Sequence, residues 1–201
     1  MLVAQSRHLK SFDAVAATRP TVTIVLSNLD AVQIPQIAEL ARESIGPDIA
    51  SQAVFERVLE YNRECCWVVY RRPEDDLFSH RLIGFTAFLL LNKLGHAAVR
   101  RDEFVGKNPD LSMLCQRNEV PSALYWWASV AHRSTAQTLP GVVQALQHPR
   151  YRHLDIYTRP GTPHGARIIG NLGFAPVLPG RTGEIGDLMV YRRAARLRLA
   201  S

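Results

Sequence analysis

The chain has 201 residues, of which 47% are hydrophobic and 21% are charged, and its net charge is +6. These proportions exclude a largely disordered protein and predict one globular domain. The longest nearly apolar run, residues 82–91, is about half as long as a membrane-spanning helix, and the cysteines show neither a disulfide framework nor metal-ligand spacing, so we expect a protein of the reducing cytoplasm.

The chain divides into three parts. Residues 1–20 carry basic groups without a continuous apolar core, which favours an N-terminal extension over a secretory signal and leaves a transit peptide open. Residues 21–191 form the predicted domain, and residues 192–201 form a basic C-terminal tail.

The first part of the domain reads as one strand followed by two helices. Residues 21–26 are mostly β-branched, which predicts a strand. Apolar residues then recur at helical spacing over residues 34–45. A second helix follows a cap at either Asp48 or Ser51.

The middle of the domain is rich in β-like runs. Residues 66–70 and 81–91 are joined by a short loop, which predicts an antiparallel hairpin. Residues 92–122 are irregular and are interpreted as an insertion that carries either substrate contacts or a short helix. Residues 123–130 are continuously bulky, as in a central strand, and their two adjacent tryptophans should point to opposite faces.

The last part alternates helix and strand. A helix is expected near residues 139–147 after a polar loop, then a strand at 153–157. A short helix through Ile168 and Ile169 precedes a final strand at 187–191. The order β-α-α-β-β-β-α-β-α-β predicts an α/β fold with a mixed, mostly antiparallel sheet and helices on both faces.

Residues 154–177, with the sequence LDIYTRPGTPHGARIIGNLGFAPV, resemble the strand–helix–"GF" ending of the GCN5-related N-acetyltransferase (GNAT) superfamily. The predicted element order matches that fold over residues 21–191. The resemblance implies that acetyl-CoA or another acyl-CoA binds as cosubstrate where two central strands separate. No metal is expected, because the histidines are scattered without ligand spacing.

The resemblance also implies a loop after the fourth strand that wraps the pyrophosphate through free backbone amides. Residues 133–138 give the best match, but Ala136 stands where the pattern has glycine, and Thr138 stands where it has glycine or alanine. An altered working loop and an abandoned one are both open. The implied cofactor-binding residues, on the fourth strand and this loop, are Ser129, Val130, Arg133, Ser134, Thr135, Ala136, Gln137 and Thr138.

Many GNAT members carry a tyrosine that reprotonates the leaving thiolate, and this chain has Ile169 at that position. A general acid or base must then come from elsewhere, and His132 and Tyr157 are the candidate catalytic residues. Tyr125 and His164 are alternatives near the same edge. Each of these side chains also fits a purely structural role, and direct transfer by positioning alone needs none of them.

Three functions follow from the resemblance. The first is an N-acyltransferase that moves an acetyl group from acetyl-CoA to an amine of a small molecule or a protein. The second is a GNAT-like binding or regulatory module without catalysis, favoured by the departures at Ala136, Thr138 and Ile169. The third uses an acyl carrier protein as donor, or RNA as acceptor, since the chain is basic; nucleic acid is disfavoured because aromatic and basic residues are not interleaved. A homodimer is left open.

Overall fold

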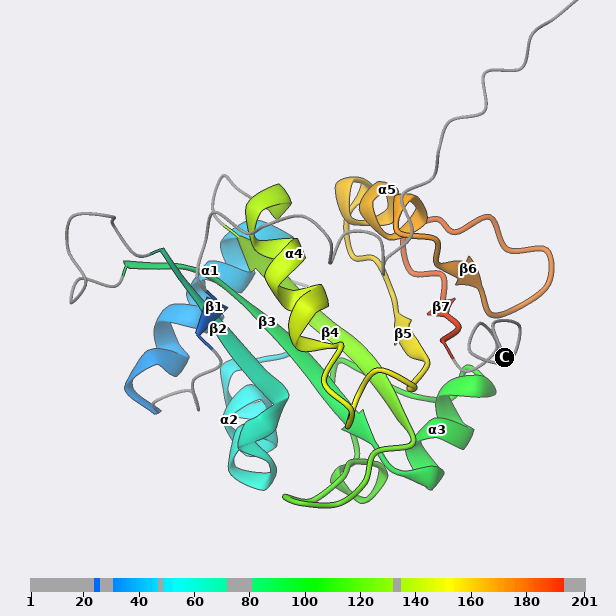
Figure 1. Cartoon of the computed structure of the whole chain (residues 1–201), viewed down its shortest axis with the longest axis horizontal. Coiled ribbons are helices and arrows are strands. Elements are labelled where there is room, and N and C mark those ends of the chain that lie inside the picture. Colours follow the sequence, from blue (N-terminus) through cyan, green and yellow to red (C-terminus); the bar gives the residue numbers. More distant parts are fainter. Residues whose placement is uncertain (1–23, 26–30, 47–48, 72–80, 132–134, 194–201) are drawn as a thin grey trace, which may run out of the picture.

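The computed structural model describes residues 24–25, 31–46, 49–71, 81–131 and 135–193 (Figure 1). Within them, 7 strands form one sheet in the order β1-β2-β3-β4-β5-β7-β6. All neighbouring strands are antiparallel except β4 and β5, which are parallel, so the predicted mixed, mostly antiparallel sheet is confirmed. The strands are β1 (Ile24–Val25), β2 (Cys66–Arg71), β3 (Arg81–Leu91), β4 (Ala123–Ala131), β5 (Ile156–Thr158), β6 (Ala175–Pro176) and β7 (Met189–Tyr191).

Helices cover both faces of this sheet, as predicted (Figure 1). On one face, α1 and α2 pack against Cys66, Val68 and Phe85. On the other face, Val142 of α4 shares a cluster with Trp67, whose side chain points away from those of its strand neighbours. The α-helices in the described residues are α1 (Ile34–Ile45), α2 (Gln52–Tyr61), α3 (Lys93–Arg100), α4 (Thr135–Ala145) and α5 (Pro163–Asn171).

The starts of α1 and α2 follow from local chemistry. Pro35 lies in the first turn of α1, where a missing amide costs nothing, and Gly46 ends the helix with a φ of 114°. The Ser51 hydroxyl caps α2 by accepting a hydrogen bond from the amide of Val54 at 3.3 Å. Of the two predicted caps, Ser51 is therefore the one used, and Asp48 lies outside the described residues.

The predicted start of α4 was wrong by one turn. The helix begins at Thr135 rather than near Leu139, so much of the expected polar loop is helical. Pro140 lies inside the helix, where it removes one hydrogen bond close to the first turn. That single loss does not outweigh the burial of Val142, Val143 and Leu146, which are at most 2% exposed.

The C-terminal strands are shorter than predicted. β5 covers only Ile156–Thr158, and β7 begins at Met189. The short strand β6 was not predicted, and it pairs with β7 through Ala175 and Val190. Such a short strand forms because it pairs with a neighbouring strand rather than because of its own β-propensity, so the sequence pattern does not predict it.

The predicted insertion at residues 92–122 contains α3 and a 3₁₀ turn, η4 (Leu111–Met113), so the short-helix interpretation is confirmed. Asn92 joins the two, since its Oδ1 accepts from the amide of Gly95 at 3.0 Å and its Nδ2 donates to the Ser112 carbonyl at 2.8 Å. These contacts hold the start of α3 against η4.

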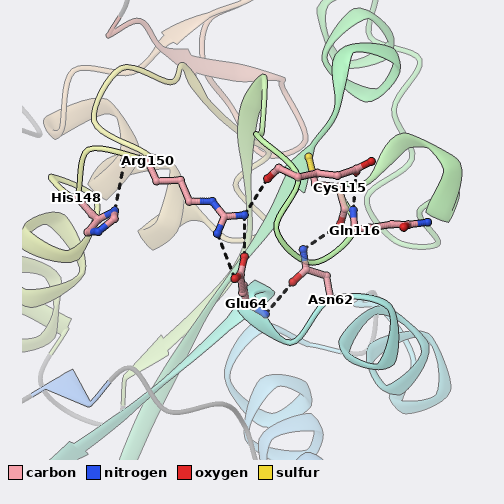
Figure 2. Close-up of polar contacts among 7 residues, drawn as sticks. Asn62, Glu64, Cys115, Gln116, His148 and Arg150 are labelled. Carbon is pink, nitrogen blue, oxygen red and sulfur yellow. Dashed lines mark hydrogen bonds and ion pairs between the residues drawn. The ribbon is translucent and has the colours of Figure 1, made fainter.

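Arg150, which follows α4, ties together three segments that are distant in sequence (Figure 2). Its two terminal nitrogens pair with the two oxygens of Glu64 at 3.1 and 3.0 Å, and Nη2 also donates to the Glu119 carbonyl at 2.8 Å. Asn62 donates to the Cys115 carbonyl at 2.9 Å beside them. This cluster anchors the segment that follows the C-terminal end of α4.

Candidate active site

The parallel strands β4 and β5 stay paired for only three residues each. Pairing runs from Leu124 and Ile156 to Trp126 and Thr158, and the Thr158 hydroxyl donates to the Trp126 carbonyl at 2.9 Å. β4 then continues to Ala131 without β5 beside it. β5 ends here because Pro160 offers no amide for pairing and the chain turns into α5. Among the described residues, no strand therefore pairs with this edge of β4 beyond Trp126, and we call it the open edge.

A β-bulge lies in β4 at the same point. Ala87 of β3 faces Ala128, but the next residue of β3, Phe88, faces Trp126. Trp127 is therefore the extra residue in β4. A bulge bends the strand and re-aims its side chains, and here it does so where the two strands part.

The two adjacent indoles pack against different elements. Trp126 stacks on Phe88 with ring centroids 5.5 Å apart, and Trp127 stacks on Phe55 of α2 at 5.1 Å. The Trp127 indole nitrogen donates to the Gly106 carbonyl at 2.7 Å. The two side chains therefore contact different elements, in agreement with the prediction that they point to opposite faces of the strand. Trp127 also contacts the loop that follows α3 through its hydrogen bond to Gly106.

A cavity of about 310 Å³ occupies the gap between the end of β4, α4 and the start of α5. Thr162 shapes its floor by capping α5, its hydroxyl accepting from the amide of Gly165 at 3.0 Å. His164 is the titratable side chain among the described residues that line this cavity. Ser129 and Val130 line it from β4.

A larger cavity of about 520 Å³ lies toward α1 and α2. Its described lining is mostly apolar, with ionisable groups from Asp102, Lys107, Tyr125 and Arg159. The two cavities have five lining residues in common, which form the wall between them: Ile45, Trp127, Ala128, Pro160 and Gly161.

Arg159 organises the polar side of the larger cavity. Its guanidinium forms an ion pair with Asp102 and donates to the Gly186 carbonyl at 2.7 Å. It thereby joins the end of β5 to the loop after α3 and to the loop before β7. Burial raises the pKa of the nearby Tyr125 phenol to about 12, so this group stays protonated at neutral pH.

Comparison with solved structures finds a similar protein from Corynebacterium glutamicum, whose 1.90 Å crystal structure is described as "histone acetyltransferase HPA2 and related acetyltransferase". The two chains are 15% identical, with a TM-score of 0.50, and the match covers 86% of this chain and 97% of the other. The chain has the GNAT acetyltransferase fold. No protein-family model and no curated protein sequence matches it.

The GNAT fold gives the predicted cofactor residues a common location. Ser129 and Val130 lie on the edge of β4 that β5 leaves open. The backbone of residues 135–138, hence of Thr135, Ala136, Gln137 and Thr138, forms the first turn of α4 rather than a loop. The first amides of a helix have no partner within it, which suits an anion. His132, Arg133 and Ser134 lie outside the described residues.

Tyr157 lies apart from both cavities. Its side chain is fully buried, and its hydroxyl is 3.1 Å from a ring nitrogen of His96 in α3. Burial lowers the pKa of His96 and raises that of Tyr157, so both rings favour their uncharged forms at neutral pH. Tyr157 lines neither cavity, so the structure does not bring this predicted catalytic residue to the gap between β4 and β5.

The cysteines offer no thiolate nucleophile. Cys65, Cys66 and Cys115 are buried free thiols. Burial raises the pKa of Cys65 to about 12 and that of Cys115 to about 11, and it also raises that of Cys66. Among the described residues, no cluster of three or more acidic, histidine or cysteine side chains could hold a metal, and no helix is long and apolar enough to cross a membrane.

Proposed function

We propose that the chain is an N-acyltransferase that takes an acyl group from acetyl-CoA, or another acyl-CoA, and transfers it to an amine. The observation that carries this proposal is the parting of β4 and β5 after Trp126 and Thr158. An open strand edge presents backbone groups to an extended, amide-containing chain such as pantetheine. The first turn of α4, which follows this edge in sequence, suits the pyrophosphate, with Arg133 as the side chain that pairs with it.

The wall shared by the two cavities supports the chemistry. With the thioester in the smaller cavity, an amine in the larger one meets it at Trp127 and Ala128. The nitrogen lone pair attacks the thioester carbonyl, a C–N bond forms, and the C–S bond breaks. The nitrogen gives up one proton and the leaving thiolate takes one up, and His164 in the smaller cavity and the predicted His132 are the candidate groups that relay this proton.

Filling the smaller cavity should weaken cofactor binding. Ser129 is exposed and lines this cavity, so Ser129→Trp places an indole there with little strain on the core. Calorimetry should show acetyl-CoA binding to the original protein and at least about tenfold weaker binding to the variant, which is about 1.4 kcal/mol. Val120→Trp, at a site that is 79% exposed, is the matched control and should bind normally.

Two outcomes would contradict the proposal. One is the absence of acetyl-CoA binding to the original protein at high micromolar concentration. The other is an equal loss of affinity in both tryptophan variants, since binding would then not depend on the gap between β4 and β5.

A non-catalytic acyl-CoA-binding module is the second candidate. It is favoured by Ile169, which lines the smaller cavity at the position where GNAT members with a catalytic tyrosine carry a phenol. The two candidates differ in one readout. The enzyme releases free thiol from acetyl-CoA when an amine is supplied, whereas the module binds acetyl-CoA and releases none.

A further inference from the structure

The larger cavity is walled mainly by hydrocarbon. α1 contributes Ile37 and Ala38, and aromatic rings come from α2, β3, β4 and the loop after α3. Its volume of about 520 Å³ falls within the usual range for sites that enclose small molecules. Val105 and Ile185, which also line it, are 61% and 53% exposed and extend the apolar surface to solvent. The cavity therefore suits an apolar small molecule.

The charged groups of this cavity are already engaged. Asp102 is the carboxylate among the described lining residues, and Arg159 forms an ion pair with it. Arg159 also donates to the Gly186 carbonyl, and Lys107 has an interaction of its own within the protein. An ammonium ion that enters such a site loses its hydration without gaining an unpaired carboxylate, which is unfavourable. The cavity therefore disfavours polyamines and lysine side chains.

The proton balance leads to the same class of acceptor. An alkylamine is protonated at neutral pH and must first lose a proton to a base. An arylamine is uncharged because its lone pair is delocalised into the ring. When it attacks the thioester, the C–N bond forms, the C–S bond breaks, and the proton released by nitrogen ends on the thiolate, so no net base is needed. The Tyr125 phenol, which lines the larger cavity and stays protonated, provides no such base there.

We propose that the acceptor is a primary arylamine with an uncharged, apolar ring substituent. Its ring lies against the stacked pair of Phe55 and Trp127, whose planes are 17° apart. Trp127 belongs to the wall between the cavities, so this position brings the amino group of the ligand toward the thioester. The inference rests on the acyltransferase function proposed above and adds the substrate class.

Three amines test the substrate class by thiol release from acetyl-CoA: 4-butylaniline, the similarly sized alkylamine 4-phenylbutylamine, and spermidine. We expect kcat/KM for 4-butylaniline to exceed that for 4-phenylbutylamine at least tenfold, and spermidine to give no release above hydrolysis. Equal or faster release with either alkylamine, or none with 4-butylaniline, overturns the arylamine inference while acetyl-CoA binding still stands. Failure of acetyl-CoA to bind overturns the proposed function itself.

Binding without turnover tests the position of the acceptor. Ala38→Leu adds bulk to the larger cavity from α1, and position 38 does not line the smaller cavity. Calorimetry with 4-butylaniline alone should show at least tenfold weaker binding, with the affinity for acetyl-CoA changed less than twofold. Gln36→Leu, on the exposed side of α1, is the control and should change neither. Unchanged 4-butylaniline binding in Ala38→Leu overturns the assignment, and Ala41→Val gives the same test if the first variant does not fold.

Discussion

Replacing Arg193 with methionine should lower the free energy of unfolding by about 3 kcal/mol. Arg193 is only 3% exposed, and its Nη1 donates to the carbonyls of Leu146 and Tyr151 at 3.0 and 3.3 Å. Leu146 directly follows α4, so the guanidinium places its positive charge at the negative end of that helix. Methionine keeps most of the side-chain volume but leaves both carbonyls without this donor. For a chain of this size, the loss corresponds to a Tm lower by roughly 6 to 12 °C.

The neighbouring arginine provides a matched control. Arg192 is 52% exposed and its ion pair with Asp155 spans 3.6 Å. Such surface pairs contribute less than about 1 kcal/mol, so Arg192→Met should leave the Tm within a few degrees. Both variants lose one positive charge. If thermal unfolding showed the same shift in both, net charge rather than the buried contacts of Arg193 would explain the effect.

Gly95→Ala should destabilise the protein by about 2 kcal/mol, although alanine is the better helix former. A Cβ atom at position 95 would lie 2.2 Å from the carbonyl oxygen of Met113. That oxygen belongs to the backbone and accepts a hydrogen bond from the amide of Asn92 at 3.1 Å, so it cannot move aside freely. The added methyl group therefore pushes α3 away from η4, and with it the loop that lines the larger cavity.

Gly170→Ala separates this steric effect from helix propensity. Position 170 lies in α5, and a Cβ atom added there would meet nothing within 4 Å beyond the backbone of its own helix. The same substitution should therefore stabilise the protein by about 0.5–1 kcal/mol. Chemical denaturation of both variants measures the two values. Changes of the same sign in both would contradict the close approach of Gly95 to Met113.

Elements with a strong local pattern were predictable. The apolar spacing of α1 and the β-rich run of β3 depend on residues close together in the chain, and their predicted bounds, residues 34–45 and 81–91, agree with the structure. The short helix before the GF sequence, α5, was also predicted through Ile168 and Ile169 from local spacing, and the structure places it there. The antiparallel pairing of β2 with β3 was predicted from the short loop that joins the two strands.

The candidate site could be predicted only in part. Ser129 and Val130 were predicted to lie on the fourth strand, and the structure confirms this position. Both residues line the smaller cavity. The grouping of Asp102, Arg159 and Tyr125 joins three segments without any motif of its own. The bulge at Trp127 depends on the pairing of β3 with β4, which a single strand sequence does not reveal.

The position of the cofactor is tested most directly by hydrogen–deuterium exchange with and without saturating acetyl-CoA. The account predicts slower amide exchange at residues 127–131 of β4 and 135–138 of α4, where the ligand would cover backbone amides. Exchange in β2, on the far side of β3, should be unchanged. If amide exchange at residues 127–131 were equally fast with and without saturating acetyl-CoA, the claim that the gap between β4 and β5 is the acyl-CoA site would be contradicted.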